Sequence, residues 1–192
     1  MSKSFVIRIP KMACVLSLLL VVVLGLLCIS IRPIQRIIYP IQNAEIVEEM
    51  STQYGIPPSL IYAVIHTESK FDPLAHSSAE ARGLMQITDD TYRWVCQRTG
   101  QDAQDPSILY NPDENIRIGV TVLHLLQQRF SHIETVLAAY NAGQGKVSTW
   151  LQDSNYSKDG LTLQHIPYEE TANYVHRVIN TQKMYQTLYN IA

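Results

Sequence analysis

The most informative side chain in this sequence is a carboxylate on an apolar helical stripe. Leu60, Ile61, Val64 and Ile65 recur at helical spacing, and the next positions on that stripe meet at Glu68. Glutamate is almost never fully buried without a partner, and burial raises a carboxyl pKa because it disfavours the charged form. A carboxyl group that keeps its proton near neutral pH can act as a general acid, and Glu68 is a candidate for that role.

The same spacing leaves an alternative open for Glu68. It could lie at a fraying helix end, turned to solvent or paired with Lys70 or Arg82. Other reactive arrangements are missing from the sequence: the 6 histidines show no metal-ligand spacing, and there is no Cys-x-x-Cys, Gly-rich phosphate loop or Gly-x-Ser-x-Gly motif. We therefore expect neither a metal nor a cofactor.

The elements that must position Glu68 are helices separated by strong stop signals. Asn111 followed by Pro112 marks a helix start, Thr88 followed by two acids marks another, and Gly100 and Gly143 mark helix ends. Alternating strand patterns are nearly absent, so the expected fold class is mainly α. The predicted helices cover residues 44–54, 57–70, 88–100, 112–130, 133–142, 147–151 and 168–189, with a polar loop or short hairpin over 152–165.

An uncharged apolar block occupies residues 12–31. As a helix it would be about 30 Å long, which matches the hydrocarbon core of a bilayer. Its apolar core is longer than that of a cleaved signal peptide and ends without a small-x-small site, so the pattern favours an uncleaved transmembrane signal-anchor. The expected organisation is a cytoplasmic tail over 1–11, the anchor over 12–31, a juxtamembrane linker over 32–42 whose prolines prevent a long helix, and one domain over 43–192.

Charge is distributed unevenly along the chain. Five basic and no acidic residues precede Asn43, whereas the remainder carries 10 basic and 17 acidic residues, a net charge of −7. Basic residues before the anchor favour an N-terminus inside the cell and a domain on the extracytoplasmic side of the cytoplasmic membrane. An acidic domain is also a poor candidate for nucleic-acid binding, which requires basic surfaces.

Four ordered motifs carry a resemblance to a known family. They are Glu68-Ser69, then Gly83-Leu84-Met85-Gln86, then Ala139-Tyr140-Asn141, and finally Glu170-Thr171-Ala172-Asn173-Tyr174-Val175. This set resembles the soluble-type bacterial lytic transglycosylases, glycoside hydrolase family 23, which have a goose-type lysozyme-like fold. The resemblance covers roughly residues 43–189. It implies a lysozyme-like, mainly helical lytic transglycosylase domain.

The resemblance also implies a reaction and its partner. The substrate would be the glycan strands of peptidoglycan, and Glu68 would protonate the β-1,4 glycosidic oxygen between N-acetylmuramic acid and N-acetylglucosamine. The ionised Glu68 would then take the proton of the muramoyl C6 hydroxyl, which closes on C1 and gives a 1,6-anhydromuramoyl end without water. The substrate N-acetyl group can stabilise the sugar cation, so a second carboxylate is not required.

The remaining motif residues are expected to bind substrate or support Glu68. The Tyr140 hydroxyl could hydrogen-bond Glu68, or simply pack in the core. The other predicted substrate-binding residues are Ser69, Met85, Gln86, Asn141, Glu170 and Tyr174, with Glu170 and Tyr174 on one face of the last helix. For Ser69 the alternative is closure of a helix end, and for Met85 it is plain core packing.

Two positions depart from the family pattern. Glu80 stands where glycine is usual, which could alter the loop over the cleft, and Val122 replaces a common tyrosine, which we expect to affect packing only. Two alternative functions stay open. One is a hydrolytic muramidase on the same fold, and the other is a peptidoglycan-binding scaffold of an envelope protein complex with little activity.

Overall fold

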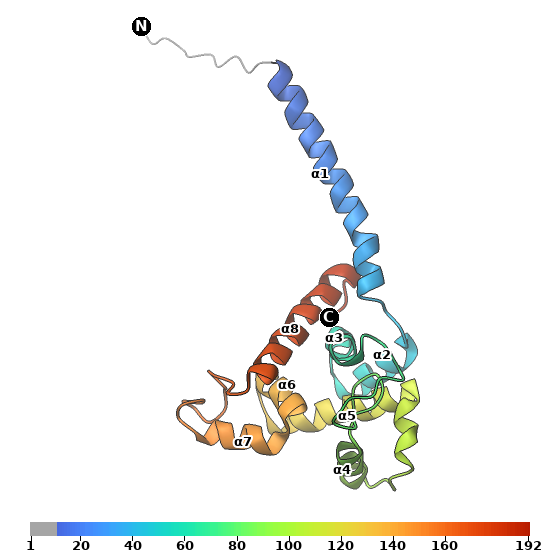
Figure 1. Cartoon of the computed structure of the whole chain (residues 1–192), viewed down its shortest axis with the longest axis vertical. Coiled ribbons are helices and arrows are strands. Elements are labelled where there is room, and N and C mark those ends of the chain that lie inside the picture. Colours follow the sequence, from blue (N-terminus) through green and yellow to red (C-terminus); the bar gives the residue numbers. More distant parts are fainter. Residues whose placement is uncertain (1–10) are drawn as a thin grey trace. The chain divides into compact units, whose positions relative to one another are not determined.

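The computed structural model describes residues 11–192, which form two units (Figure 1). The cytoplasmic tail expected over 1–11 therefore lies outside the described residues, apart from Lys11. The first unit ends at Pro40 and the second covers Ile41–Ala192.

The first unit contains helix α1 (Lys11–Ile38), which runs through Pro33. The prediction that Pro33 would prevent a long helix here was wrong. One proline removes a single hydrogen bond from a helix of 28 residues, and the ladder continues on both sides. The helix stops before Tyr39, the residue preceding Pro40, where the α conformation is disfavoured. Among the residues that the structure describes, no helix is both long enough and apolar enough to cross a membrane.

The second unit is mainly helical, as predicted. Its described residues include two isolated antiparallel bridges, His76 with Arg82 and Arg82 with Ile87, and no longer strand. The segment 152–165 is accordingly a loop and not a hairpin. The helical elements are α2 (Ala44–Tyr54), α3 (Pro58–Ser69), α4 (Asp89–Thr99), the 3-10 helix η1 (Pro106–Tyr110), α5 (Pro112–Arg129), α6 (Ile133–Ala142), α7 (Gln144–Gln152) and α8 (Glu169–Tyr189).

Local capping explains why the starts of α4 and α5 were predictable. The Asn111 side chain accepts hydrogen bonds from the backbone N–H groups of Asp113 and Glu114, and Thr88 accepts from that of Thr91. Two features were missed. Helix α7 begins at Gln144, three residues earlier than expected, and η1 has too few residues to leave a periodic signal.

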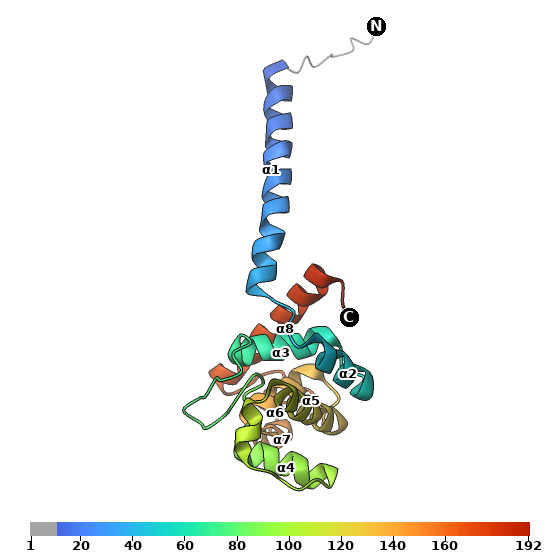
Figure 2. The ribbon, with the colours of Figure 1, turned by 90° about the vertical axis from the view of Figure 1, so that its right-hand side faces the viewer.

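Helix α5 runs through the middle of this unit. It contacts α2, α4, α6 and η1, and almost all of its residues from Asn115 to Leu123 are buried. Helix α4 lies on the side of α5 away from α3 in both views (Figures 1 and 2). Helix α8 packs along α3 and α6, and it brings the buried rings of Tyr174 and Tyr185 into the core. Helix α8 therefore lies against the helix that carries Glu68, whose side chain stays partly exposed.

Candidate active site

Glu68 lies in the last turn of α3, directly after a buried run from Ser59 to Ile65. Burial raises its pKa from 4.5 to about 7, while the Tyr174 hydroxyl and the Arg177 guanidinium lower the pKa and offset part of that effect. The predicted raised pKa is thus present. Arg82, the alternative partner, forms ion pairs with Glu80 and Asp89 instead.

A cavity of about 500 Å³ opens in front of Glu68. Five of the predicted site residues line it, namely Glu68, Gln86, Tyr140, Asn141 and Glu170. The other lining residues are Ser77, Ser78, Ala79, Ala81, Ile87, Thr88, Thr91, Val122, Ala142 and Gly143. Val122, which was expected to affect packing only, is therefore also part of the cavity wall. Side chains from α3, α4, α5, α6, α8 and the 75–87 loop converge here.

Two phenols flank the carboxyl group: Tyr174 is buried and Tyr140 is partly buried. The Tyr140 hydroxyl donates to the backbone oxygen of Met85 at 2.8 Å, so the expected hydrogen bond from Tyr140 to Glu68 is not formed. The Tyr174 hydroxyl interacts with Glu68, yet it is buried and has no partner in standard hydrogen-bond geometry within the described chain. Burial, and then the charge of Glu68, raise the pKa of both phenols well above 10, so each stays protonated.

Ser69 and Met85 lie behind the cavity wall. The Ser69 hydroxyl donates to the backbone oxygen of Leu84 at 2.8 Å and fastens the end of α3 to the following loop. The Met85 side chain is fully buried against Gly119, where any Cβ would collide with its sulfur. Neither side chain lines the cavity, so their positions fit the alternatives of helix closure and core packing.

Asn115 holds the loop that carries Gln86, a role that sequence reasoning missed. Its Oδ1 accepts from the Met85 N–H at 2.7 Å, and its Nδ2 donates to the carbonyls of Arg82 at 2.9 Å and Leu109 at 2.8 Å. A Cβ at Gly83, whose φ is +74°, would collide with both Asn115 and the Leu109 carbonyl. The available signal was a polar residue inside the apolar run of α5.

Gln86 is fixed in an unusual conformation. Its φ of 50° is left-handed, which costs energy for a residue other than glycine. Its Nε2 donates to the carbonyls of Ala75 at 3.2 Å and Gly83 at 3.0 Å, so the side chain closes its own loop. Both amide protons are used in these bonds, which leaves the amide oxygen as the group that can accept from a ligand.

The opposite wall contains a second fixed amide. Asn141 is exposed at the end of α6, and its Oδ1 accepts a hydrogen bond of 2.8 Å from the buried Thr171 hydroxyl on α8. This bond leaves the Asn141 NH₂ group as a donor at the cavity wall. Thr171 was part of a recognised motif but had been assigned no role.

Glu80 shapes the loop that borders the cavity. Its φ of 58° is left-handed, and its carboxylate lies 3.1 Å from His76 Nε2 and 3.8 Å from Arg82. Arg82 in turn pairs with Asp89 at the start of α4. Glutamate at this position thus lacks the conformational freedom of glycine but adds charge contacts across the loop.

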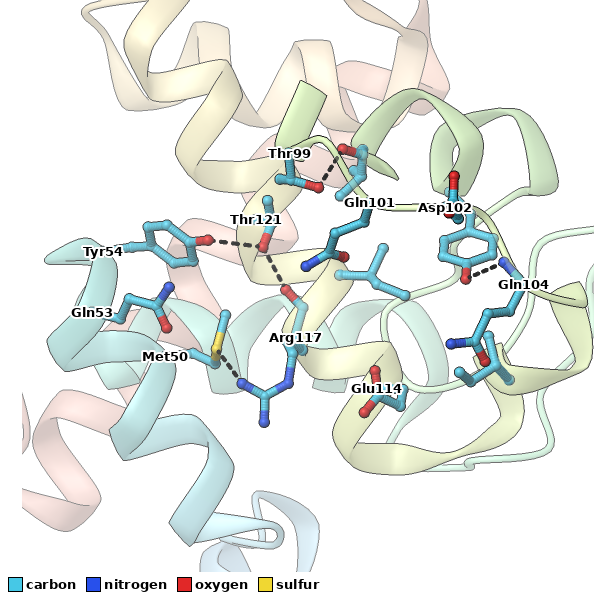
Figure 3. A pocket seen from close by; sticks show the side chains of 14 residues that line it. Met50, Gln53, Tyr54, Thr99, Gln101, Asp102, Gln104, Glu114, Arg117 and Thr121 are labelled. Atoms are coloured by element: carbon cyan, nitrogen blue, oxygen red, sulfur yellow. Dashed lines mark hydrogen bonds between the residues drawn. The ribbon is translucent and has the colours of Figure 1, made fainter. Parts of the chain in front are cut away.

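A second hollow of about 560 Å³ lies between α2, α4 and α5 (Figure 3). None of the predicted site residues lines it. Its Arg117 pairs with Glu49 at 2.7 Å, and the hydroxyls of Tyr54 and Tyr92 already accept hydrogen bonds. Its labelled polar side chains are dispersed around the rim and do not converge on one point (Figure 3). The cavity in front of Glu68 is therefore the better candidate for an active site.

Comparison with known proteins agrees with this geometry. The family model described as "Transglycosylase SLT domain" matches residues 45–162. The chain is 34% identical over 163 residues to membrane-bound lytic murein transglycosylase C of Sodalis glossinidius, covering 73% of this chain and 45% of that protein. It is 31% identical over 151 residues to the soluble lytic murein transglycosylase of Escherichia coli K12, covering 77% of this chain and 23% of that protein.

Solved structures give the same result. An inactive mutant of lytic transglycosylase Slt from Pseudomonas aeruginosa matches 81% of this chain and 25% of its own, with a TM-score of 0.70 and 28% identity. The 70 kDa soluble lytic transglycosylase in complex with bulgecin A matches 80% of this chain and 25% of its own, with a TM-score of 0.71. The chain thus spans less than half the length of these relatives. Since the family model covers more than half of it, the chain belongs to the transglycosylase SLT-domain family.

Proposed function

We propose that this protein is a peptidoglycan lytic transglycosylase with Glu68 as its acid and base. One observation supports this above the others: in a member of the transglycosylase SLT-domain family, a carboxyl group with a pKa of about 7 faces a cavity of about 500 Å³. A group with that pKa is half protonated at neutral pH, so it can give a proton in one step and receive one in the next.

The proposed reaction uses one carboxyl group twice. Protonated Glu68 donates to the oxygen between N-acetylmuramic acid and N-acetylglucosamine, the C1–O bond breaks, and the N-acetyl group stabilises the cation at C1. Ionised Glu68 then removes the proton of the muramoyl C6 hydroxyl, whose oxygen bonds to C1. Glu170 is the other carboxylate in the cavity wall, and its side chain is exposed.

The surrounding groups have distinct proposed tasks. The unpartnered Tyr174 hydroxyl can donate to Glu68 once that group is ionised, between the two proton transfers. Tyr140 keeps the Met85 backbone in place below the cavity. Gln86 and Asn141 present an acceptor and a donor to the N-acetyl and hydroxyl groups of a sugar.

The test is mass spectrometry of the products that the purified full chain, in detergent, releases from intact peptidoglycan. Anhydromuramoyl ends that disappear with Glu68→Gln are expected. Reducing ends that disappear with the same variant would make the protein a hydrolytic muramidase with the same acid. Binding without any product from the wild-type chain would contradict catalysis and favour the scaffold of an envelope complex.

We further propose that residues 12–31 anchor the protein in the cytoplasmic membrane, with the N-terminus inside and the catalytic domain outside. The uncharged sequence, the exposed side chains from Leu16 to Val22 and the name of the S. glossinidius relative support this. A protease-sensitive tag fused after Ala192 should be cleaved by external protease in spheroplasts. Protection of the tag would contradict this orientation.

A further inference from the structure

Tyr168 is an aromatic side chain left on the surface beside the candidate active site. It is the N-cap residue of α8 and remains 48% exposed. Among the large apolar side chains that are exposed in the described second unit, it is the aromatic one, with Ile41, Leu74 and Leu161 as the others. Tyrosine is enriched at binding interfaces, because a complex removes its ring from water while its hydroxyl can stay hydrated.

Two side chains of α7 contact the Tyr168 ring. Trp150, only 7% exposed, meets the Tyr168 ring edge-to-face at a centroid separation of 5.0 Å and an interplanar angle of 72°. The Lys146 ammonium lies over the Tyr168 ring, 5.2 Å from its centroid. Trp150 is anchored in the core, whereas Lys146 is an exposed side chain. A cation–π contact at an exposed site is weak, so a ligand can displace the lysine without moving the tyrosine.

Tyr168 and Lys146, which contact each other, are each close in sequence to a residue that lines the cavity. Gly143 and Glu170 both line the cavity. Lys146 comes three residues after Gly143, and Tyr168 comes two residues before Glu170. The hydrogen bond between Thr171 and Asn141 ties the start of α8 to the end of α6 at this corner. A polymer that leaves the cavity past Gly143 and Glu170 therefore reaches the segments that carry Lys146 and Tyr168.

The chemistry of this corner suits a sugar ring. A pyranose presents a face of C–H groups, which packs against an aromatic ring, and a rim of hydroxyl groups, which stays in water. We propose that Tyr168 is an accessory subsite that stacks on a pyranose ring of the bound glycan strand beyond the sugars held in the cavity, with Lys146 displaced from the ring. This inference rests on the proposed function, since the strand is that of the substrate.

The test compares short and long glycan strands as substrates for the full chain. Tyr168→Ala is expected to raise KM for long strands by roughly fivefold, the order of one aromatic stacking contact, while kcat on long strands and kcat/KM on the shortest cleaved oligosaccharide stay unchanged. Tyr168→Trp should restore the long-strand KM. The matched control is Leu161→Ala, which removes another exposed apolar side chain from the segment between α7 and α8 and should change neither value.

Two outcomes would overturn the subsite. An equal loss on short and long strands, together with a lower melting temperature, would show that Tyr168 only supports the fold, and an unchanged long-strand KM would show that no sugar stacks there. A second assay, sedimentation with purified glycan strands, measures binding without turnover and so tests the subsite independently of catalysis. In that assay the Glu68→Gln chain binds without cleaving, and adding Tyr168→Ala should weaken its binding to long strands by a similar factor.

Discussion

At the scale of single residues, the pKa of Glu68 is set by opposing effects. Burial raises it, whereas the Tyr174 hydroxyl and the positive charge of Arg177 lower it, and the result is about 7. An acid of that pKa is about half protonated at pH 7 and about one tenth protonated at pH 8. The alkaline side of the pH profile therefore reports on Glu68 directly.

Removal of the Arg177 charge should move that profile. Arg177→Gln takes away an attraction that favours ionised Glu68, so the pKa rises further and the alkaline fall in kcat/KM moves to higher pH. The measurement is kcat/KM across about pH 5 to pH 9. Arg93→Gln, an exposed arginine on α4, is the control and should leave the profile in place. If Arg177→Gln left the pH profile unchanged, the alkaline fall in kcat/KM would not be caused by ionisation of Glu68.

The raised pKa also has a consequence for stability. Glu68 has a higher pKa in the folded chain than its ordinary 4.5, so its contribution to stability is complete below pH 4.5 and is lost as the pH rises through about 7. Above that pH the buried charge costs up to about 3 kcal/mol. Glu68→Gln should therefore melt several degrees above the wild type at pH 8, with the gap closing toward pH 4.5. An equal gap at every pH, measured by thermal unfolding, would contradict this origin.

At the scale of elements, the parts of the site that sequence could predict are local. The position of Glu68 follows from the spacing on one helix, and the cap of α5 needs only Asn111 and its next residues. The support of the cavity could not be predicted from spacing, because it joins distant segments. The bond from Asn115 to Met85 spans 30 residues and that from Tyr140 to Met85 spans 55.

Those long-range bonds explain why the expected partner of Tyr140 was wrong. Its residue type indicated a hydroxyl near Glu68, and both residues line one cavity. The neighbouring Met85 carbonyl is brought within 2.8 Å by the packing of the 75–87 loop on α5, and it accepts the hydrogen bond of the Tyr140 hydroxyl. Residue type thus predicted that Tyr140 lies near Glu68, whereas tertiary packing determines which atom accepts its hydrogen bond.

The contact between α5 and the loop leads to a prediction at Gly119. Gly119→Ala would push a Cβ into the Met85 side chain, shifting the carbonyl that holds Tyr140. We expect a loss of about 1–3 kcal/mol in the free energy of unfolding and a lower kcat. Gly145→Ala is the matched control: it meets no atom within 4 Å on α7 and should stabilise the helix by up to about 1 kcal/mol. Equal behaviour of the two variants in denaturant unfolding and turnover would contradict the packing argument.

At the scale of the whole molecule, the basic residues near the N-terminus and the candidate active site belong to different units of the chain. The five basic residues that precede Asn43 belong to the first unit, whereas the cavity lies in the second, which carries a net charge of −7. The proposed substrate is anionic too, because its peptide stems end in carboxylates. The second unit and the proposed substrate therefore repel each other at long range, and contacts in the cavity must overcome that repulsion.

This repulsion predicts an unusual dependence on salt. Raising the ionic strength from about 0.01 M to 0.15 M shortens the screening length from about 30 Å to 8 Å, so the repulsion fades while buried contacts around Glu68 are little affected. Glu68→Gln protein should therefore bind peptidoglycan strands more tightly at the higher salt, as measured by sedimentation. Neutral N-acetylglucosamine oligomers are the control and should bind equally at both. Weaker binding to peptidoglycan at high salt would contradict this prediction. It would mean that salt removes a local attraction, in which basic side chains near the cavity, such as Lys146 and Arg177, outweigh the net charge of the unit.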